Sequence, residues 1–67
     1  MINVFINGES FSFDAALSVD GIVEKLRLDK RKIAIERNLE IVPRSQYSEI
    51  LIQDNDRIEI VGFIGGG

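Results

Sequence analysis

The 67-residue sequence contains no cysteine, no histidine and no tryptophan. Without cysteine the chain cannot form a disulfide, a thiolate metal site, a cysteine nucleophile or a side-chain persulfide. Without histidine it lacks the usual general base and the commonest transition-metal ligand. We therefore expect no metal site, no bound cofactor and no independent enzyme activity from this chain.

The sequence also lacks an excess of basic residues and any long apolar run. Eight Lys and Arg face 11 Asp and Glu, which gives a net charge of -3. Nucleic-acid binding requires a basic surface, so we expect no nucleic-acid partner and favour partners that present positive surfaces. No apolar run approaches the ~20 residues of a membrane-spanning helix. Residues 1–4 lack the basic start of a signal peptide, so we expect a cytoplasmic protein without a membrane partner.

Length and composition predict one small domain over residues 1–67. Hydrophobic residues make up 45% of the chain and charged residues 28%, which is typical of a globular protein. A chain of this size buries only about 60% of the surface that its unfolded form exposes. One compact core is feasible, but a deep catalytic cleft beside it is not.

The first 13 residues predict a β-hairpin. Ile2, Val4 and Ile6 alternate with other residues, the pattern of a half-buried strand. Asn7-Gly8 is the strongest short hairpin signal, because a type I′ turn requires positive φ at both central residues. Residues 9–13 alternate again and predict the return strand.

An amphipathic helix is predicted to begin after Ser18, whose hydroxyl is a good N-cap. The apolar stripe of this helix should pack on a sheet, and the helix should end near Leu28. The charged run 29–32 is interpreted as a surface loop. The stripe consists of Val19, Ile22, Val23 and Leu26.

The second half predicts short strands at 33–37 and 40–42, a turn near 45–48 and a last strand at 57–61. Leu51 and Ile52 should pack beneath that turn. Asp54 and Asp56 could hold a cation, but the segment lacks the glycine and distal glutamate of a calcium loop, so a plain turn is favoured. This element order predicts an α+β fold of β-grasp topology. In it, one main helix packs on one face of a mixed sheet, and the first and last strands lie parallel at the sheet centre.

Three of the six glycines are Gly65, Gly66 and Gly67. We predict that this segment is a flexible tail, since glycine has the largest entropic cost of ordering. Three residues reach at most ~10 Å, and a thread without side chains can enter a narrow channel. The Gly67 carboxylate, ionised at neutral pH, could then attack the α-phosphate of ATP in a partner's active site. A frayed terminus is the competing interpretation.

A partner surface is predicted beside this tail. If Ile2, Val4 and Ile6 face the helix, Phe5 faces outward, and the same alternation places Val61 on the outer side of the last strand. With the residues that follow, they would form an apolar patch for a partner at the base of the tail. The predicted interface residues are Phe5, Val61, Phe63 and Ile64.

Over essentially its whole length the chain resembles the ThiS family of sulfur carrier proteins, the small ubiquitin-like proteins of thiamin biosynthesis. The resemblance rests on Ile6-Asn7-Gly8, on the segment from Glu36 to Arg44 (ERNLEIVPR), and on Asp56 to Val61 (DRIEIV) leading into Phe63-Ile64-Gly65-Gly66-Gly67. It implies that a ThiF-type adenylyltransferase uses ATP to activate Gly67. A cysteine desulfurase-based donor would then convert the carboxylate to a thiocarboxylate, from which thiazole synthase takes the sulfur. The protein would be a cosubstrate and no enzyme.

Three other interpretations stay open at this point. A ubiquitin-like protein modifier would use the same fold and tail but transfer its carboxyl group to a lysine amine. A molybdopterin-type sulfur carrier would differ only in its partners. A non-covalent β-grasp binding module would not need its terminal glycines at all.

Overall fold

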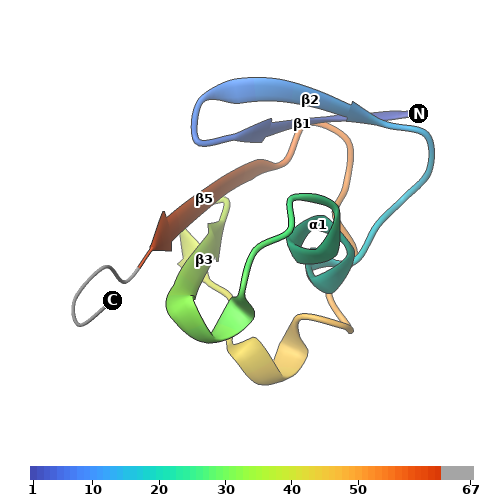
Figure 1. Ribbon diagram of the computed structural model, residues 1–67. Helices are drawn as coiled ribbons and strands as arrows, with labels where there is room; N and C mark the ends of the chain where they lie inside the picture. Colours follow the sequence, from blue (N-terminus) through green and yellow to red (C-terminus); the bar gives the residue numbers. More distant parts are fainter. Residues whose placement is uncertain (63–67) are drawn as a thin grey trace.

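The computed structural model describes residues 1–62, so the predicted flexible tail at 65–67 lies outside the described residues. These residues form five strands and one α-helix, which lies on one side of the strands (Figure 1). In chain order the elements are β1 (Ile2–Ile6), β2 (Glu9–Phe13), α1 (Val19–Lys25), the 3-10 turn η1 (Lys30–Lys32), β3 (Ile33–Arg37), β4 (Glu40–Ile41), the 3-10 turn η2 (Arg44–Gln46) and β5 (Arg57–Gly62).

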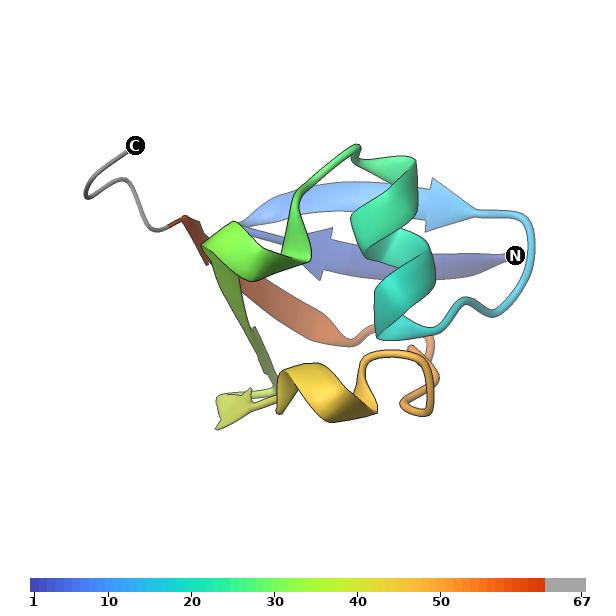
Figure 2. The ribbon, with the colours of Figure 1, turned by 60° about the horizontal axis from the view of Figure 1, so that its bottom comes forward.

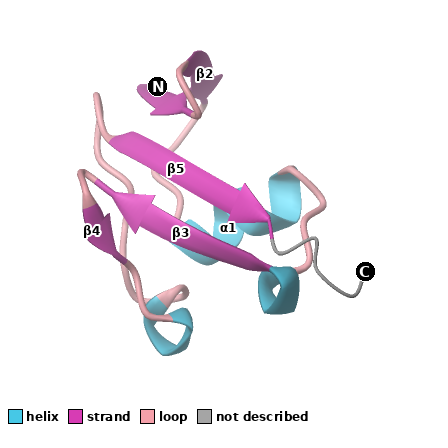
Figure 3. Ribbon diagram, turned by 90° about the vertical axis from the view of Figure 1, so that its left-hand side faces the viewer, coloured by secondary structure: helices cyan, strands magenta, loops and turns pink. Residues whose placement is uncertain are grey.

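The strands form one mixed sheet in the order β2-β1-β5-β3-β4. β1 and β5 run parallel, whereas the other neighbouring pairs are antiparallel. α1 packs on one face of this sheet, and the view of Figure 3 shows it behind β5 and β3. The predicted β-grasp fold, with its first and last strands side by side, is confirmed.

The β1–β2 hairpin forms as predicted. Its two turn residues, Asn7 and Gly8, have φ values of 51° and 83°. Both therefore occupy the left-handed region that a type I′ turn requires. The turn sets the hairpin register, in which Ile6 lies opposite Glu9 and Ile2 lies opposite Phe13.

α1 begins where predicted but ends earlier. The Ser18 hydroxyl accepts a hydrogen bond from the Gly21 amide at 3.0 Å, so it caps the first turn. The helix stops at Lys25 because Arg27 adopts a positive φ of 57° and its amide bonds back to the carbonyl of Glu24. The amide of Leu28 bonds to the carbonyl of Val23, which completes a Schellman motif. This C-cap usually carries glycine, and the sequence offers none here.

The core lies between α1 and the inner face of the sheet, with the segment around η2 closing one side (Figure 2). Of the predicted helix stripe, three residues are buried and Leu26, just beyond the helix, is partly buried. Ile52 is buried as predicted, but Leu51 is 54% exposed. The buried apolar residues are Val4, Ile6, Val19, Ile22, Val23, Ile33, Ile35, Val42, Tyr47, Ile52 and Ile58.

Two further segments differ from prediction. The charged run 29–32 is no open loop, because Asp29 accepts a hydrogen bond from the Arg31 amide and caps η1. β4 contains one residue fewer than predicted. Val42 leaves the strand, and its side chain is buried in the core.

The two glycines at the ends of the hairpin turn and of β5 provide a test of backbone strain. At both Gly8 and Gly62 an added Cβ would meet no atom within 4 Å, but only Gly8 has a positive φ. We expect Gly8→Ala to lower the free energy of unfolding by about 1–2 kcal/mol, because a left-handed alanine is strained. Gly62→Ala should be neutral or stabilising by up to about 0.5–1 kcal/mol. Urea unfolding of both variants measures the difference, and equal effects would contradict the turn geometry.

Candidate functional site

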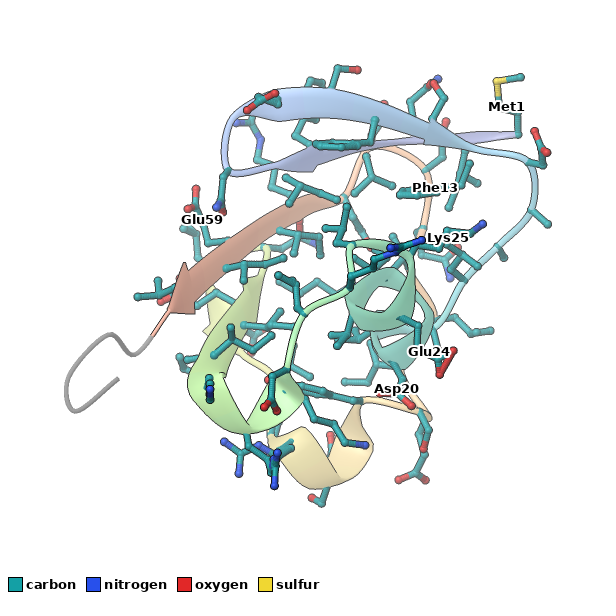
Figure 4. All side chains as sticks on the ribbon, in the orientation of Figure 1. Met1, Phe13, Asp20, Glu24, Lys25 and Glu59 are labelled. Carbon is teal, nitrogen blue, oxygen red and sulfur yellow. The ribbon has the colours of Figure 1, made fainter. Side chains whose placement is uncertain are left out.

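The side of the sheet that faces away from α1 is called here the outer sheet face. Side chains alternate along each strand, and partners on adjacent strands share a face. Ile58 and Ile60 of β5 point inward, so Arg57, Glu59 and Val61, which alternate with them, point outward. Figure 4 shows Glu59 on the side of β5 away from α1. The outer sheet face includes Phe5, Ala34, Glu36, Ile41, Arg57, Glu59 and Val61, together with Asn3, Ser10 and Ser12 of the β1–β2 hairpin.

The two predicted interface residues among 1–62 both lie on this face, as expected from alternation. Phe5 is 37% exposed and Val61 is 55% exposed. The register between β1 and β5 nevertheless places Phe5 beside Arg57, four residues before Val61. At ~3.3 Å per residue the two are roughly 13 Å apart. Phe5 and Val61 therefore do not lie side by side on this face, and their part in an interface stays a prediction. The other two interface residues, Phe63 and Ile64, lie outside the described residues.

Arg57 covers part of Phe5. Its guanidinium carbon lies 5.6 Å from the centroid of the Phe5 ring, within the range of a cation–π contact. The exposed end of the face is therefore the other end, where Val61 precedes Gly62 at the close of β5. This is the end from which the chain continues into the glycine segment.

Of the described members of this face, sequence reasoning named only Phe5 and Val61. Glu36 of β3 lies directly opposite Glu59 of β5, and Ile41 of β4 lies opposite Glu36. Ile41 is 66% exposed. The alternation in IAIER and RIEIV was a sufficient signal that both glutamates point outward. That they meet required the pairing of β3 with β5, which no local pattern reveals.

The beginning of β5 is held in place by the carboxylate of Asp56, which is only 6% exposed. The carboxylate accepts hydrogen bonds from Arg37 Nε at 2.7 Å, Asn38 Nδ2 at 3.1 Å and the Gln53 amide at 2.8 Å. The Asp56 carbonyl in turn accepts from the Phe5 amide at 2.9 Å. One residue thus ties β1, β5 and the end of β3 together.

This environment lowers the pKa of Asp56 below its usual 3.8. Burial raises the pKa, because it disfavours the charged carboxylate. The hydrogen bonds from Gln53, Arg37 and Asn38, together with the Arg37 charge, outweigh that effect. The native state therefore favours an ionised Asp56.

The turn that contains Asp54 and Asp56 does not assemble a cation site. Asp54 Oδ1 accepts a hydrogen bond from the Asn3 amide at 2.7 Å, whereas Asp56 points to Arg37. No group of three potential metal-binding side chains occurs among residues 1–62. Within the same residues, no helix has the length and apolarity needed to cross a membrane.

A shallow groove opens on the other side of the molecule, between α1 and η1. Four of its charged side chains form ion pairs within the groove, Lys30 with Asp20 at 3.7 Å and Arg31 with Asp29 at 3.2 Å. It lies on the α1 side, away from the outer sheet face. Its lining residues are Asp20, Val23, Glu24, Leu28, Asp29, Lys30 and Arg31.

Comparison with known proteins places these features in a family. The chain matches the ThiS family over residues 2–67. It is 48% identical to a thiazole synthase of Paramagnetospirillum magneticum over 98% of this chain but only 20% of that protein. It is 36% identical to the sulfur carrier protein ThiS of Bacillus subtilis, over 75% of this chain and 76% of that protein. The chain thus spans about a fifth of the length of the thiazole synthases it matches.

A solved structure agrees with the fold. The crystal structure of a thiamine biosynthesis protein (ThiS) from Geobacter metallireducens superposes with a TM-score of 0.84. The two sequences are 26% identical, and the match covers 98% of this chain and all of the other.

The Asp56 network predicts a specific loss of stability in acid. Because the pKa of Asp56 is lower in the folded state than in the unfolded state, its contribution is present above about pH 4. That contribution is lost as the pH falls through the folded-state pKa. At pH 7, Asp56→Asn should lower the free energy of unfolding by about 1–3 kcal/mol, since it leaves partly buried donors without an anionic acceptor.

Urea unfolding between pH 2 and 7 measures this dependence. The Asp56→Asn variant should lose less stability on acidification than the natural protein. Asp54→Asn is the matched control, because that carboxylate is exposed and accepts one hydrogen bond from the Asn3 amide. If the two variants were equally destabilised at pH 7, the network would not hold β5 in place.

Proposed function

This chain belongs to the ThiS family, and on that premise we propose that it is a sulfur carrier protein of thiamin biosynthesis. The observation that supports this most directly is the family match over residues 2–67, which includes all three glycines of the tail. The fold contributes a rigid support, since β5 is a central strand of the sheet and leads into that tail. In this role the protein is a cosubstrate and no enzyme.

The proposed chemistry takes place on the α-carboxylate of Gly67. A carboxylate oxygen attacks the α-phosphate of ATP, pyrophosphate leaves, and an acyl-adenylate forms. A hydrosulfide ion then attacks the acyl carbon and displaces AMP, which leaves a thiocarboxylate. If the donor presents a persulfide instead, an acyl disulfide forms first, and a thiol of the donor cleaves its S–S bond, which releases the thiocarboxylate and leaves a disulfide on the donor. The chain has no cysteine, so the terminal carboxyl group is the place at which it can carry sulfur.

The partners follow from this sequence of steps. A ThiF-type adenylyltransferase would bind ATP and activate Gly67, and a cysteine desulfurase-based donor would supply the sulfur. Thiazole synthase would receive the sulfur for thiazole formation. The relatives named thiazole synthase support the last pairing, because about a fifth of each of those chains matches this one.

Intact mass spectrometry tests the proposal. The mass of the natural protein is measured first, which establishes the residue that carries its terminal carboxylate. The protein is then incubated with ATP, the cognate adenylyltransferase and a sulfide source. Replacement of one oxygen by one sulfur is the expected result. A protein that never gains sulfur, or that forms isopeptide-linked conjugates in extract, would overturn the carrier role.

Extension of the chain beyond Gly67 should abolish sulfur loading. One added alanine moves the carboxylate by ~3.5 Å and introduces a side chain into a path suited to glycine. In-line attack on phosphorus does not tolerate such a displacement, so we expect a rate loss of at least roughly 100-fold. An alanine added before Met1 is the control and should have no effect. Loading of the extended chain at its usual rate would show that Gly67 is not the reactive position.

A charge at the exposed end of the outer sheet face should weaken docking more than one at the covered end. We expect Val61→Asp to raise the KM for adenylation by about tenfold, because Val61 lies at the end of β5 from which the chain continues toward the tail. Phe5→Asp should raise it less, since Arg57 already covers that ring. Leu51→Asp is the control, with the same exposure near α1. Steady-state kinetics decide, and a larger effect from Phe5 would contradict this ranking.

A further inference from the structure

The centre of the outer sheet face contains a pair of like charges. Glu36 on β3 and Glu59 on β5 are direct cross-strand partners in the antiparallel pairing. Side chains at such positions have Cβ atoms about 4.5–5.5 Å apart, and like charges placed there destabilise a sheet. The fold therefore gains nothing from this pair.

No cation of the described part of the chain neutralises these two glutamates. The ion pairs within 4 Å among residues 1–62 join Lys30 to Asp20, Arg31 to Asp29 and Arg37 to Asp56. Arg57, which is on the same face, places its guanidinium over the Phe5 ring. The pair is thus an uncompensated negative site on the central strands.

Apolar side chains flank this negative site. Ile41 lies beside Glu36 on the edge strand β4, and Val61 follows two residues after Glu59 on β5. Both are more than half exposed. An exposed apolar surface with a charge pair at its centre resembles a protein interface, in which an Arg is a frequent anchor.

We infer that Glu36 and Glu59 together bind the guanidinium of an arginine that the adenylyltransferase presents between apolar side chains. Arginine fits this position because its planar fork donates several hydrogen bonds and can engage two carboxylates at once. Binding of the guanidinium offsets the repulsion between the two glutamates. The complex thus contains the neutralising cation that the described part of the free domain does not provide. The inference rests on the proposed function, since the enzyme that takes the tail must approach the end of β5.

The two glutamates should therefore affect folding and docking in opposite directions. Glu36→Gln and Glu59→Gln each remove one charge without changing shape. For the free domain we expect the urea midpoint to rise by roughly 0.2–1 M, because the repulsion is relieved. For binding to the cognate adenylyltransferase we expect Kd to rise by about tenfold, with a weaker dependence on salt.

Charge reversal sharpens the test. Glu59→Lys would place a cation opposite Glu36, so the free domain should become more stable still, while docking should weaken by more than tenfold. Glu40→Gln on β4 is the matched control. Glu40 is also exposed, but it lies opposite Arg37 and therefore not on the outer sheet face that carries Glu36. It should leave Kd unchanged.

Binding is measured by calorimetry without ATP or sulfide, so the result does not depend on whether sulfur is loaded. An unchanged Kd for both glutamine variants would overturn the inference, even if their binding to thiazole synthase or to a second copy of this chain were altered. A loss of both stability and affinity would also overturn it, because that result indicates a structural role. The carrier function is tested separately, by the mass measurement of sulfur loading.

Discussion

The carboxylate of Asp56 is the interaction on which the arrangement of the sheet depends. It is the one buried charged side chain among residues 1–62, and each hydrogen bond that it accepts comes from a different residue. A buried charge without partners would be costly, so the network constrains where Arg37 and Asn38 can lie. Since the Asp56 carbonyl also accepts a hydrogen bond from the Phe5 amide, the chain is held between β1 and β3 at the residue that precedes β5.

From that point the alternation of β5 divides the molecule into two faces. Ile58 and Ile60 point toward α1 and contribute to the core, while Arg57, Glu59 and Val61 point to the other side. The inner face provides the stability of the domain. The outer sheet face contributes little to stability and carries exposed apolar residues together with two opposed glutamates. We interpret this division as a rigid support with one side available for partners.

The same division fits the proposed function, in which the partner enzymes supply the catalytic groups. The chemistry that we propose takes place in partner enzymes, and the domain has only to present its tail in a defined direction. A central strand is well suited to this task, because its neighbours on both sides restrict its movement. The cost of the Glu36–Glu59 pair is tolerable since Asp56 and the apolar core stabilise the strands that carry it.

Local sequence patterns determined much of this structure. Asn7-Gly8 specified the hairpin, Ser18 the start of the helix, and alternation the outward direction of Phe5 and Val61, since each depends on residues only a few positions apart. The resemblance carried by ERNLEIVPR, DRIEIV and the terminal glycines identified the family. Only the tertiary structure decided that Asp56 pairs with Arg37, that Phe5 lies beside Arg57, that Glu36 meets Glu59, and that the helix ends at a left-handed Arg27. The three pairings join residues 19 or more positions apart, and the helix end has no glycine to mark it, so the energies that select them arise only when the strands and the core have come together.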